Sequence, residues 1–254
     1  MAKIWMIVSS VVALVAALFY FKWEDDGTPA CTSKAAMTTT VLLPDPLIVY
    51  IENFLTDDDV VKLKDLAKDR FEQSTLIENG VKVPSPIRTS STAMLSDGEQ
   101  ITKCVAQRAA RFQNLADTDS IEPIQATRYV KGQQYKPHLD LLWSDLSAQH
   151  HVDRNTTIFA ILDDNCTDCG TQFPNIHVDL SATHQKWCEF MDCTKSVLTV
   201  KPKKGNAVFW KNLLDDGMAD MRSVHSGLPL AEGSKMGLNI WTRNGGFPKE
   251  LREL

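Results

Sequence analysis

A histidine and an aspartate stand two residues apart in the stretch YKPHLDLLWSD, at His138 and Asp140. Both side chains carry atoms that bind metal ions, and residues two apart in a β-strand project from the same face. The pair could therefore supply two ligands to one metal. On its own, however, such a pair is more commonly a hydrogen-bonded pair on a protein surface.

A second histidine, His225, and a lysine ten residues later, Lys235, lie in a further strand-like segment, SVHSGLPLAEGSKMGLNIWTR. Together with His138 and Asp140, His225 completes a set of two imidazoles and one carboxylate. This set occupies three positions of an octahedron and leaves three open, as in the facial triad of non-haem Fe(II) sites. A lysine within an apolar strand is costly unless it meets an anion. A dicarboxylate co-substrate would supply one, because its keto-acid end can chelate iron while its distal carboxylate pairs with the ammonium.

Four longer motifs hold these residues: RYVKGQQYKPHLD, CGTQFP, VKPKKGNAVFWKN and VHSGLPLAEGSKMGLNIWTR. Through them the chain resembles the Fe(II)/2-oxoglutarate dioxygenases of the prolyl 4-hydroxylase α-subunit type, from Leu47 to Arg243. The resemblance implies a double-stranded β-helix (jelly roll). It also implies hydroxylation of an unactivated C–H bond with Fe(II), with 2-oxoglutarate and O2 as co-substrates, and with ascorbate as reductant.

The resemblance also assigns roles residue by residue. The matching iron ligands are His138, Asp140 and His225, and the partner of the distal 2-oxoglutarate carboxylate is Lys235. Other positions that touch 2-oxoglutarate are Tyr129 and Thr171, and those that face a peptide substrate are Tyr135, Arg154 and Trp241. Each of these five also has a plainer explanation: the aromatic residues as core packing, the threonine as a turn hydroxyl, and the arginine as a solvated charge.

The chain departs from the common pattern of the family at a few positions that are not ligands. The family often has a glycine pair where Asp168 and Cys169 stand, and often a cysteine in place of Leu228. The segment WCEFMDC, together with GLNIWTR, looks like a fungal branch of the family. In that branch the resemblance implies a disulfide between Cys188 and Cys193.

Four of the six cysteines cluster in one segment, at Cys166, Cys169, Cys188 and Cys193. In an oxidising compartment such a cluster indicates disulfides that tie down a loop. A zinc site is the alternative, because two residues separate the first two cysteines and a second pair follows. The wider spacing of the second pair and the shortness of the segment favour disulfides. Asn155, at a predicted strand start, and Asn165, in a predicted loop, fit the glycosylation sequon.

The elements that must position these residues follow from local patterns. A strand over Leu47–Ile51 leads into a helix for which Thr56 is a suitable N-cap, and a second helix is expected over about Asp97–Leu115. From Ile124 onward, short β-branched and aromatic runs alternate with turn residues, which indicates a sandwich or barrel. We therefore predict a mainly β fold with flanking helices (α+β), in which a jelly-roll core carries an N-terminal helical layer and a transmembrane helix precedes both.

The N-terminus carries eighteen residues without a charge, Ile4 to Phe21, between Lys3 and Lys22. That length can span a bilayer, and the flanking charges favour an N-terminus in the cytosol. We expect a signal anchor over 1–24, a linker over 25–44 and one dioxygenase domain over 45–254. This arrangement predicts a single-pass type II protein of the endoplasmic reticulum or another secretory membrane, with a lumenal catalytic domain. A cleaved signal peptide is the alternative.

The charge composition of the chain excludes one class of partner. The net charge of −5 comes from scattered residues without a basic block, which argues against nucleic acid. The expected activity is hydroxylation of proline in a peptide. One alternative is the tailoring of a small molecule in fungal secondary metabolism. Another is a membrane-tethered binding protein without catalysis, against which the complete triad argues. The sequence does not determine the oligomeric state.

Overall fold

The computed structural model describes residues 31, 36–78, 81–141, 154–179, 185–248, 250 and 252. The chain separates into two units, Met1–Cys31 and Thr32–Leu254, and every element described below belongs to the second. The predicted anchor lies outside the described residues. Within the part that is described, no helix is both long and apolar enough to cross a bilayer.

Most strands belong to two antiparallel sheets. The strands of the larger sheet are β1 (Thr38–Pro44), β2 (Leu47–Glu52), β3 (Glu72–Gln73), β6 (Ser91–Met94), β7 (Gln125–Val130), β9 (Arg154–Asp163), β10 (Cys166–Thr167), β13 (Ala207–Lys211) and β15 (Glu232–Arg243). They run in the order β1-β2-β13-β9-β15-β7-β6-β3, with β10 beside β15.

The smaller sheet contains β8 (Tyr135–His138), β11 (Thr171–His177), β12 (Val197–Val200) and β14 (His225–Gly227). Its strand order is β12-β11-β14-β8. A separate hairpin is formed by β4 (Thr75–Glu78) and β5 (Val81–Pro84). Two short 3-10 helices, η1 (Gln185–Glu189) and η2 (Met221–Ser223), precede β12 and β14.

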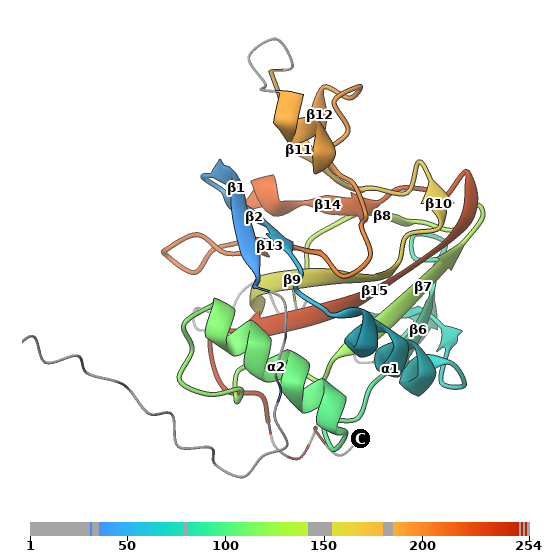
Figure 1. The fold of residues 1–254 in the computed structure, drawn as a ribbon, viewed down its shortest axis with the longest axis vertical. Helices are drawn as coiled ribbons and strands as arrows, with labels where there is room; N and C mark the ends of the chain where they lie inside the picture. Colours follow the sequence, from blue (N-terminus) through green and yellow to red (C-terminus); the bar gives the residue numbers. More distant parts are fainter. Residues whose placement is uncertain are drawn as a thin grey trace, which may run out of the picture. The chain divides into compact units, whose positions relative to one another are not determined.

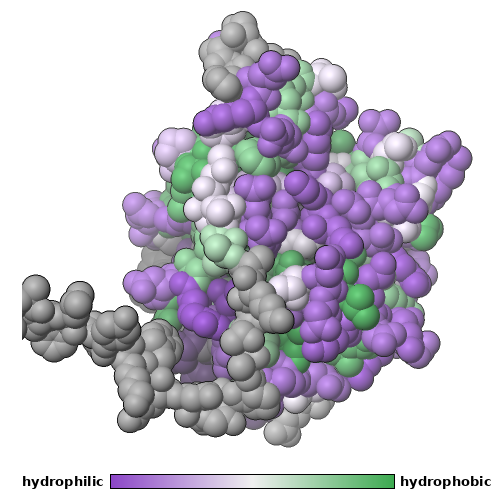
Figure 2. All heavy atoms as spheres, viewed as in Figure 1, coloured by the Kyte–Doolittle hydropathy of each residue, from purple (hydrophilic) through white to green (hydrophobic). Residues whose placement is uncertain are grey.

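Two helices, α1 (Asp57–Ala67) and α2 (Gln100–Phe112), lie against the larger sheet (Figure 1). Thr56 caps α1 as predicted, because its hydroxyl accepts from the backbone N–H of Asp59 at 3.1 Å and the Asp59 carboxylate accepts from the N–H of Thr56 at 2.9 Å. This reciprocal pair satisfies two backbone donors at the helix start. Hydrophilic residues dominate the face seen in Figure 2, with smaller apolar patches between them.

The larger sheet is buried on both faces, as its central strand β9 illustrates. Ile158 and Ala160 pack with residues of α1 and α2, whereas Phe159 and Ile161 pack with Phe173 and other residues of the smaller sheet. Because alternate residues of a strand face opposite sides, a strand covered on both faces is apolar throughout. This explains the unbroken run TTIFAIL, and it places the second core between the two sheets.

The predicted class is confirmed at the level of a mainly β architecture with few helices, and the two packed antiparallel sheets agree with a jelly roll. The predicted helical layer is present as α1 and α2, although the strands β3 to β6 lie between these helices in the chain. One boundary differs: β1 lies within the range predicted as linker. Its threonines and exposed side chains gave no core signal, because β1 is an edge strand defined by its pairing with β2.

Candidate metal centre

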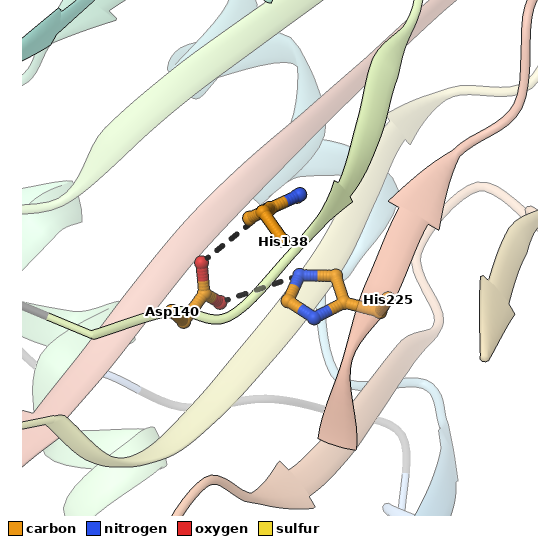
Figure 3. Close-up of side chains that lie close together, drawn as sticks. All are labelled: His138, Asp140 and His225. Atoms are coloured by element: carbon orange, nitrogen blue, oxygen red, sulfur yellow. Dashed lines mark ion pairs between the residues drawn. The ribbon is translucent and has the colours of Figure 1, made fainter. Parts of the chain in front are cut away.

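Three predicted ligands meet between the two sheets (Figure 3). His138 ends β8, His225 begins β14, and the two residues are direct partners in the pairing of these strands. Asp140 completes the cluster, in which one ligand atom from each residue lies within 4.8 Å of the others. The Nε2 atoms of His138 and His225 are each 3.6 Å from a different carboxylate oxygen of Asp140. All three side chains point toward one another, as the sequence predicted.

The position of Asp140 corrects one detail of that prediction. β8 ends at His138, so Asp140 lies in the segment that follows and not on the same strand. Its carboxylate still turns toward the histidines, because Oδ2 accepts a hydrogen bond from the Thr157 hydroxyl of β9 at 2.9 Å. The neighbouring sheet, and not strand periodicity, therefore directs this side chain.

Both histidines present Nε2 to the cluster in the form that binds metals. The Nδ1 of His138 lies 2.8 Å from the carbonyl oxygen of Lys136, and the Nδ1 of His225 lies 3.0 Å from that of Ser223. A carbonyl oxygen can only accept, so each Nδ1 carries a proton, and in the neutral form of each ring Nε2 is the atom with the free lone pair. Two such lone pairs and a carboxylate facing one another repel unless a cation lies between them. The donor set therefore fits a metal ion.

Burial and mutual contact set the charges of the cluster. Burial, followed by the nearby His138, lowers the pKa of His225 to about 4, so this imidazole is neutral at physiological pH. Burial opposes ionisation of Asp140, but the two histidines and Arg154 outweigh it and hold the pKa of the carboxyl well below its usual range. A neutral imidazole at His225 beside an ionised Asp140 is the combination of protonation states that metal binding requires.

Lys235 is a buried cation in β15, paired with β7. Its side chain is 1% exposed, and burial lowers its pKa to about 7. Among the described residues, its Nζ has one hydrogen-bond partner, the carbonyl oxygen of Cys169 at 2.6 Å. The ammonium also lies 5.1 Å from the ring centroid of Tyr129, its partner across β7 and β15. With one of its three donors used, the group suits an anionic ligand.

Comparison with known proteins agrees with this geometry. Residues 124–243 match the model of the 2OG-Fe(II) oxygenase superfamily, where 2OG is 2-oxoglutarate. The chain is 30% identical over 200 residues to prolyl 4-hydroxylase 5 of Arabidopsis thaliana, covering 78% of this chain and 68% of that protein. It is also 30% identical over 223 residues to probable prolyl 4-hydroxylase 10 of the same plant, covering 87% and 74%. The chain belongs to the prolyl 4-hydroxylase-like 2OG-Fe(II) oxygenases.

As a member of this family, the protein is a dioxygenase that uses Fe(II) and 2-oxoglutarate, and the His138–Asp140–His225 cluster is a ligand set of the expected composition. Its fold is similar to that of the viral collagen prolyl hydroxylase vCPH of Paramecium bursaria Chlorella virus-1, solved with 2OG. That comparison has a TM-score of 0.56 at 21% identity and covers 77% of this chain and 95% of the viral one.

The structure also locates the other predicted residues of this dioxygenase. Tyr129 is buried beside Lys235, and Thr171 begins β11 opposite Gly227 of β14. Tyr135 stacks on the ring of His138, with the ring centroids 3.4 Å apart. Arg154 and Trp241 meet each other, since the guanidinium lies 3.6 Å from the indole.

The cysteine cluster forms disulfides and not a zinc site. Cys166 bonds to Cys169 and Cys188 bonds to Cys193, and the described residues contain no free cysteine. Asn155 is the second residue of β9 and half-buried, whereas Asn165 is exposed between β9 and β10. Their glycosylation stays a prediction.

Several side chains around the site were not singled out from the sequence. Glu122 accepts two hydrogen bonds from Arg154, at 2.8 and 2.9 Å, and fixes its position. The Trp210 ring packs on His225 with centroids 4.5 Å apart. Trp210 lies in the motif VKPKKGNAVFWKN, which was singled out only for the family resemblance. Its contact with a ligand required the pairing of strands far apart in sequence.

Proposed function

We propose that this dioxygenase hydroxylates proline residues within peptides or secreted proteins at carbon 4. The observation that carries the proposal is the convergence of two Nε2 atoms and a carboxylate, in a chain that also buries Lys235 and whose relatives are prolyl 4-hydroxylases. The intact triad and Lys235 argue against a binding protein without catalysis. No contact in the described residues favours a small-molecule substrate.

Iron would be held by His138, Asp140 and His225, since these side chains converge with the donor types that Fe(II) takes in facial triads. When bound, Fe(II) supplies activation of O2 and, with 2-oxoglutarate, the oxidation that inserts one oxygen atom into a C–H bond. The residues of the chain position the reactants and keep water out. Tyr135, stacked on His138, excludes water from one side of the metal centre. Ascorbate is proposed as the reductant that keeps the iron ferrous.

Lys235 would pair with the distal carboxylate of 2-oxoglutarate. Its burial makes an ion pair in this pocket stronger than in water. The Tyr129 hydroxyl and Thr171 hydroxyl would add hydrogen bonds, since both side chains are buried near Lys235 or the second ligand strand. The ammonium is held by the Cys169 carbonyl before 2-oxoglutarate arrives, so little ordering is required on binding.

The peptide would lie against Tyr135, Arg154 and Trp241. The Arg154 guanidinium is fixed from one side by the Glu122 carboxylate and from the other by the Trp241 ring. A guanidinium held in this way can donate to a peptide carbonyl without first losing side-chain freedom. The buried Nε1 of Trp241 has no hydrogen-bond partner in the described residues, so it too can donate to a substrate.

Purified enzyme with Fe(II), 2-oxoglutarate, O2 and proline-rich peptides tests the proposal. We expect succinate formation and a peptide heavier by one oxygen atom on proline, both lost in His225→Ala. The same peptides with alanine in place of each proline serve as controls. Turnover of 2-oxoglutarate without modification of any peptide in a library with varied flanking residues would contradict a peptide substrate. Normal succinate formation by His225→Ala would contradict the metal assignment itself.

We further propose a type II arrangement in the endoplasmic reticulum or another secretory membrane, with the catalytic domain in the lumen. Support comes from the uncharged run Ile4 to Phe21 and from two disulfides, which persist in oxidising compartments. Sealed microsomes treated with protease provide the test: a protected catalytic domain that carries glycan at Asn165 is expected, and full digestion without detergent contradicts this placement. Membership of a fungal branch stays a prediction.

A further inference from the structure

A line of buried polar side chains ends at the metal-binding carboxylate. The Nε1 of Trp210 lies 2.8 Å from Oδ1 of Asn212, Nδ2 of Asn212 lies 2.9 Å from the Thr157 hydroxyl, and that hydroxyl lies 2.9 Å from Oδ2 of Asp140. Thr157 and Asn212 are completely buried, and Trp210 and Asp140 are 2% and 6% exposed. Most polar groups buried this deeply in proteins are hydrogen-bonded, and every member of this line is.

The chemistry of the four groups fixes the direction of every bond. An indole N–H can only donate, so it requires the carbonyl oxygen of Asn212 and orients the amide. The amide nitrogen must then donate to Thr157. The threonine hydroxyl has a single proton, which is left for Asp140. The carboxylate of Asp140 thus receives a hydrogen bond whose direction is set three side chains away, at Trp210.

The fold positions this line through strand register. Trp210 of β13 and Thr157 of β9 are direct partners, so their side chains stand side by side on the face toward the smaller sheet. Asn212 follows two residues later, and its backbone is held at both polar groups: its N–H donates to the carbonyl of Asn155 at 2.8 Å, and its own carbonyl accepts from Asp220 at 2.9 Å. These backbone contacts fix the point from which the amide side chain reaches Thr157.

The same line supports a second ligand. The Trp210 ring, which packs against His225, is also held edge-on by Phe173, with ring centroids 5.5 Å apart. Trp210 therefore contacts one metal ligand directly and orients another through Asn212 and Thr157. A shift at Asn212 would disturb both ligands.

We propose that Thr157 and Asn212 are positioning residues, which fix the carboxylate plane of Asp140 before metal arrives and thereby raise metal affinity. This inference rests on Asp140 being an iron ligand. The torsion that rotates a carboxylate about its Cβ–Cγ bond is broad, so a carboxylate without a fixed donor samples many orientations. Outer contacts to ligands typically change metal affinity by about 10- to 100-fold. A loss of this size is expected when the Thr157 hydroxyl is removed.

Binding of Mn(II), a redox-inert substitute for Fe(II), tests the proposal without reference to activity or substrate. Thr157→Val, which keeps the shape but lacks the hydroxyl, is expected to raise the Mn(II) Kd by about 10- to 100-fold. Thr157→Ser, which restores the hydroxyl, is expected to bind within about threefold of wild type. The Co(II) absorption spectrum of Thr157→Val should also change, because the ligand geometry around the metal changes.

Thr242→Val is a matched control. Thr242 is 3% exposed, and its hydroxyl accepts from the Gln113 side-chain amide at 2.9 Å, just as the Thr157 hydroxyl accepts from Asn212. Trp241 is the direct strand partner of Thr157, so the next residue, Thr242, points to the face of the sheet opposite to Thr157. Loss of the Thr242 hydroxyl should lower the melting temperature of the metal-free protein without changing its affinity for Mn(II). If Thr157→Val behaves like this control, the line is merely structural and the proposal is wrong.

Asn212→Asp provides a second, independent variant that keeps the side-chain shape. It places a carboxylate oxygen where the amide donated, so Asp140 must compete for the single Thr157 proton, and the Mn(II) Kd should rise. A wild-type Kd for this variant overturns the proposal even if Thr157→Val does not fold. His225→Ala gives the Mn(II) Kd of a protein that lacks one of the three ligands. Tight Mn(II) binding by this variant would overturn the metal assignment.

Discussion

The Nζ of Lys235 donates to the backbone carbonyl of Cys169, a residue that is itself half of a disulfide with Cys166. The small disulfide loop also pairs with the strand that carries the lysine, since Cys166 is the partner of Gly233 across β10 and β15. The disulfide, the carbonyl and the lysine therefore form one unit. Where the family often has a glycine pair, this chain places a crosslink beside Lys235, the proposed partner of 2-oxoglutarate.

Removal of this crosslink should weaken 2-oxoglutarate binding. In Cys166→Ser/Cys169→Ser the Cys169 carbonyl is no longer held toward Lys235, and loss of one hydrogen bond corresponds to about a two- to tenfold rise in the 2-oxoglutarate Kd. Titration of the Mn(II)-loaded protein measures it. Cys188→Ser/Cys193→Ser removes the other disulfide and should leave this Kd unchanged. Equal values for the two double variants would contradict the link between Cys169 and the pocket.

The affinity for 2-oxoglutarate should fall as pH rises above neutrality. Burial lowers the pKa of Lys235 to about 7 in the free protein, so the side chain is protonated below that pH and neutral above it. Binding of a carboxylate favours the charged form, so above about pH 7 each binding event must take up a proton, and the Kd should rise by up to about tenfold per pH unit. Lys235→Arg, which stays charged, should lose this dependence. A flat profile in the wild-type protein would refute the charge pairing.

Gly233 should be essential for the close packing of β10 against β15, the strand that carries Lys235. It has a positive φ of 80°, and a Cβ there would meet the carbonyl oxygen of Asn165 at 1.9 Å. Because the obstacle is backbone, Gly233→Ala should push β10 from β15, lower the melting temperature markedly and weaken 2-oxoglutarate binding. Gly217 has a φ of 83° with nothing within 4 Å, so Gly217→Ala isolates the cost of the backbone conformation, about 1 kcal/mol. An equal fall in the melting temperatures of the two variants would contradict a steric clash between residue 233 and the Asn165 carbonyl.

Helices and strands that are specified by residues close together in the sequence could be predicted from it. The cap at Thr56 depends on residues three apart, and the strand β2 on its own run of apolar residues, so both were predicted from the sequence. The ligand set was also accessible, because its residue types and order are diagnostic. The edge strand β1 was missed because its identity comes from pairing with β2 and not from its own composition.

Contacts between distant segments explain what the sequence did not reveal. Asp140 turns inward through Thr157, and Thr157 is oriented by Asn212, which lies 55 positions further along the chain. No periodicity within either strand encodes this relation, since it arises from the register between β9 and β13. The residue types that chelate metal can thus be recognised in a sequence, whereas the residues that hold them in place require the fold.

Arg154 should act on the peptide and not on 2-oxoglutarate. If its guanidinium donates to the substrate, Arg154→Ala loses a charged hydrogen bond of about 1.5–3 kcal/mol, which lowers kcat/KM for the peptide by about 10- to 150-fold. Substrate-free turnover of 2-oxoglutarate should stay near the wild-type rate. Arg243 also contacts the Glu122 carboxylate, with its Nε at 3.1 Å, so Glu122 binds both arginines. Arg243→Ala therefore tests whether the loss of peptide turnover comes only from disturbing Glu122. A loss of peptide turnover in Arg154→Ala alone supports direct contact, whereas an equal loss in both variants assigns the effect to the buried carboxylate.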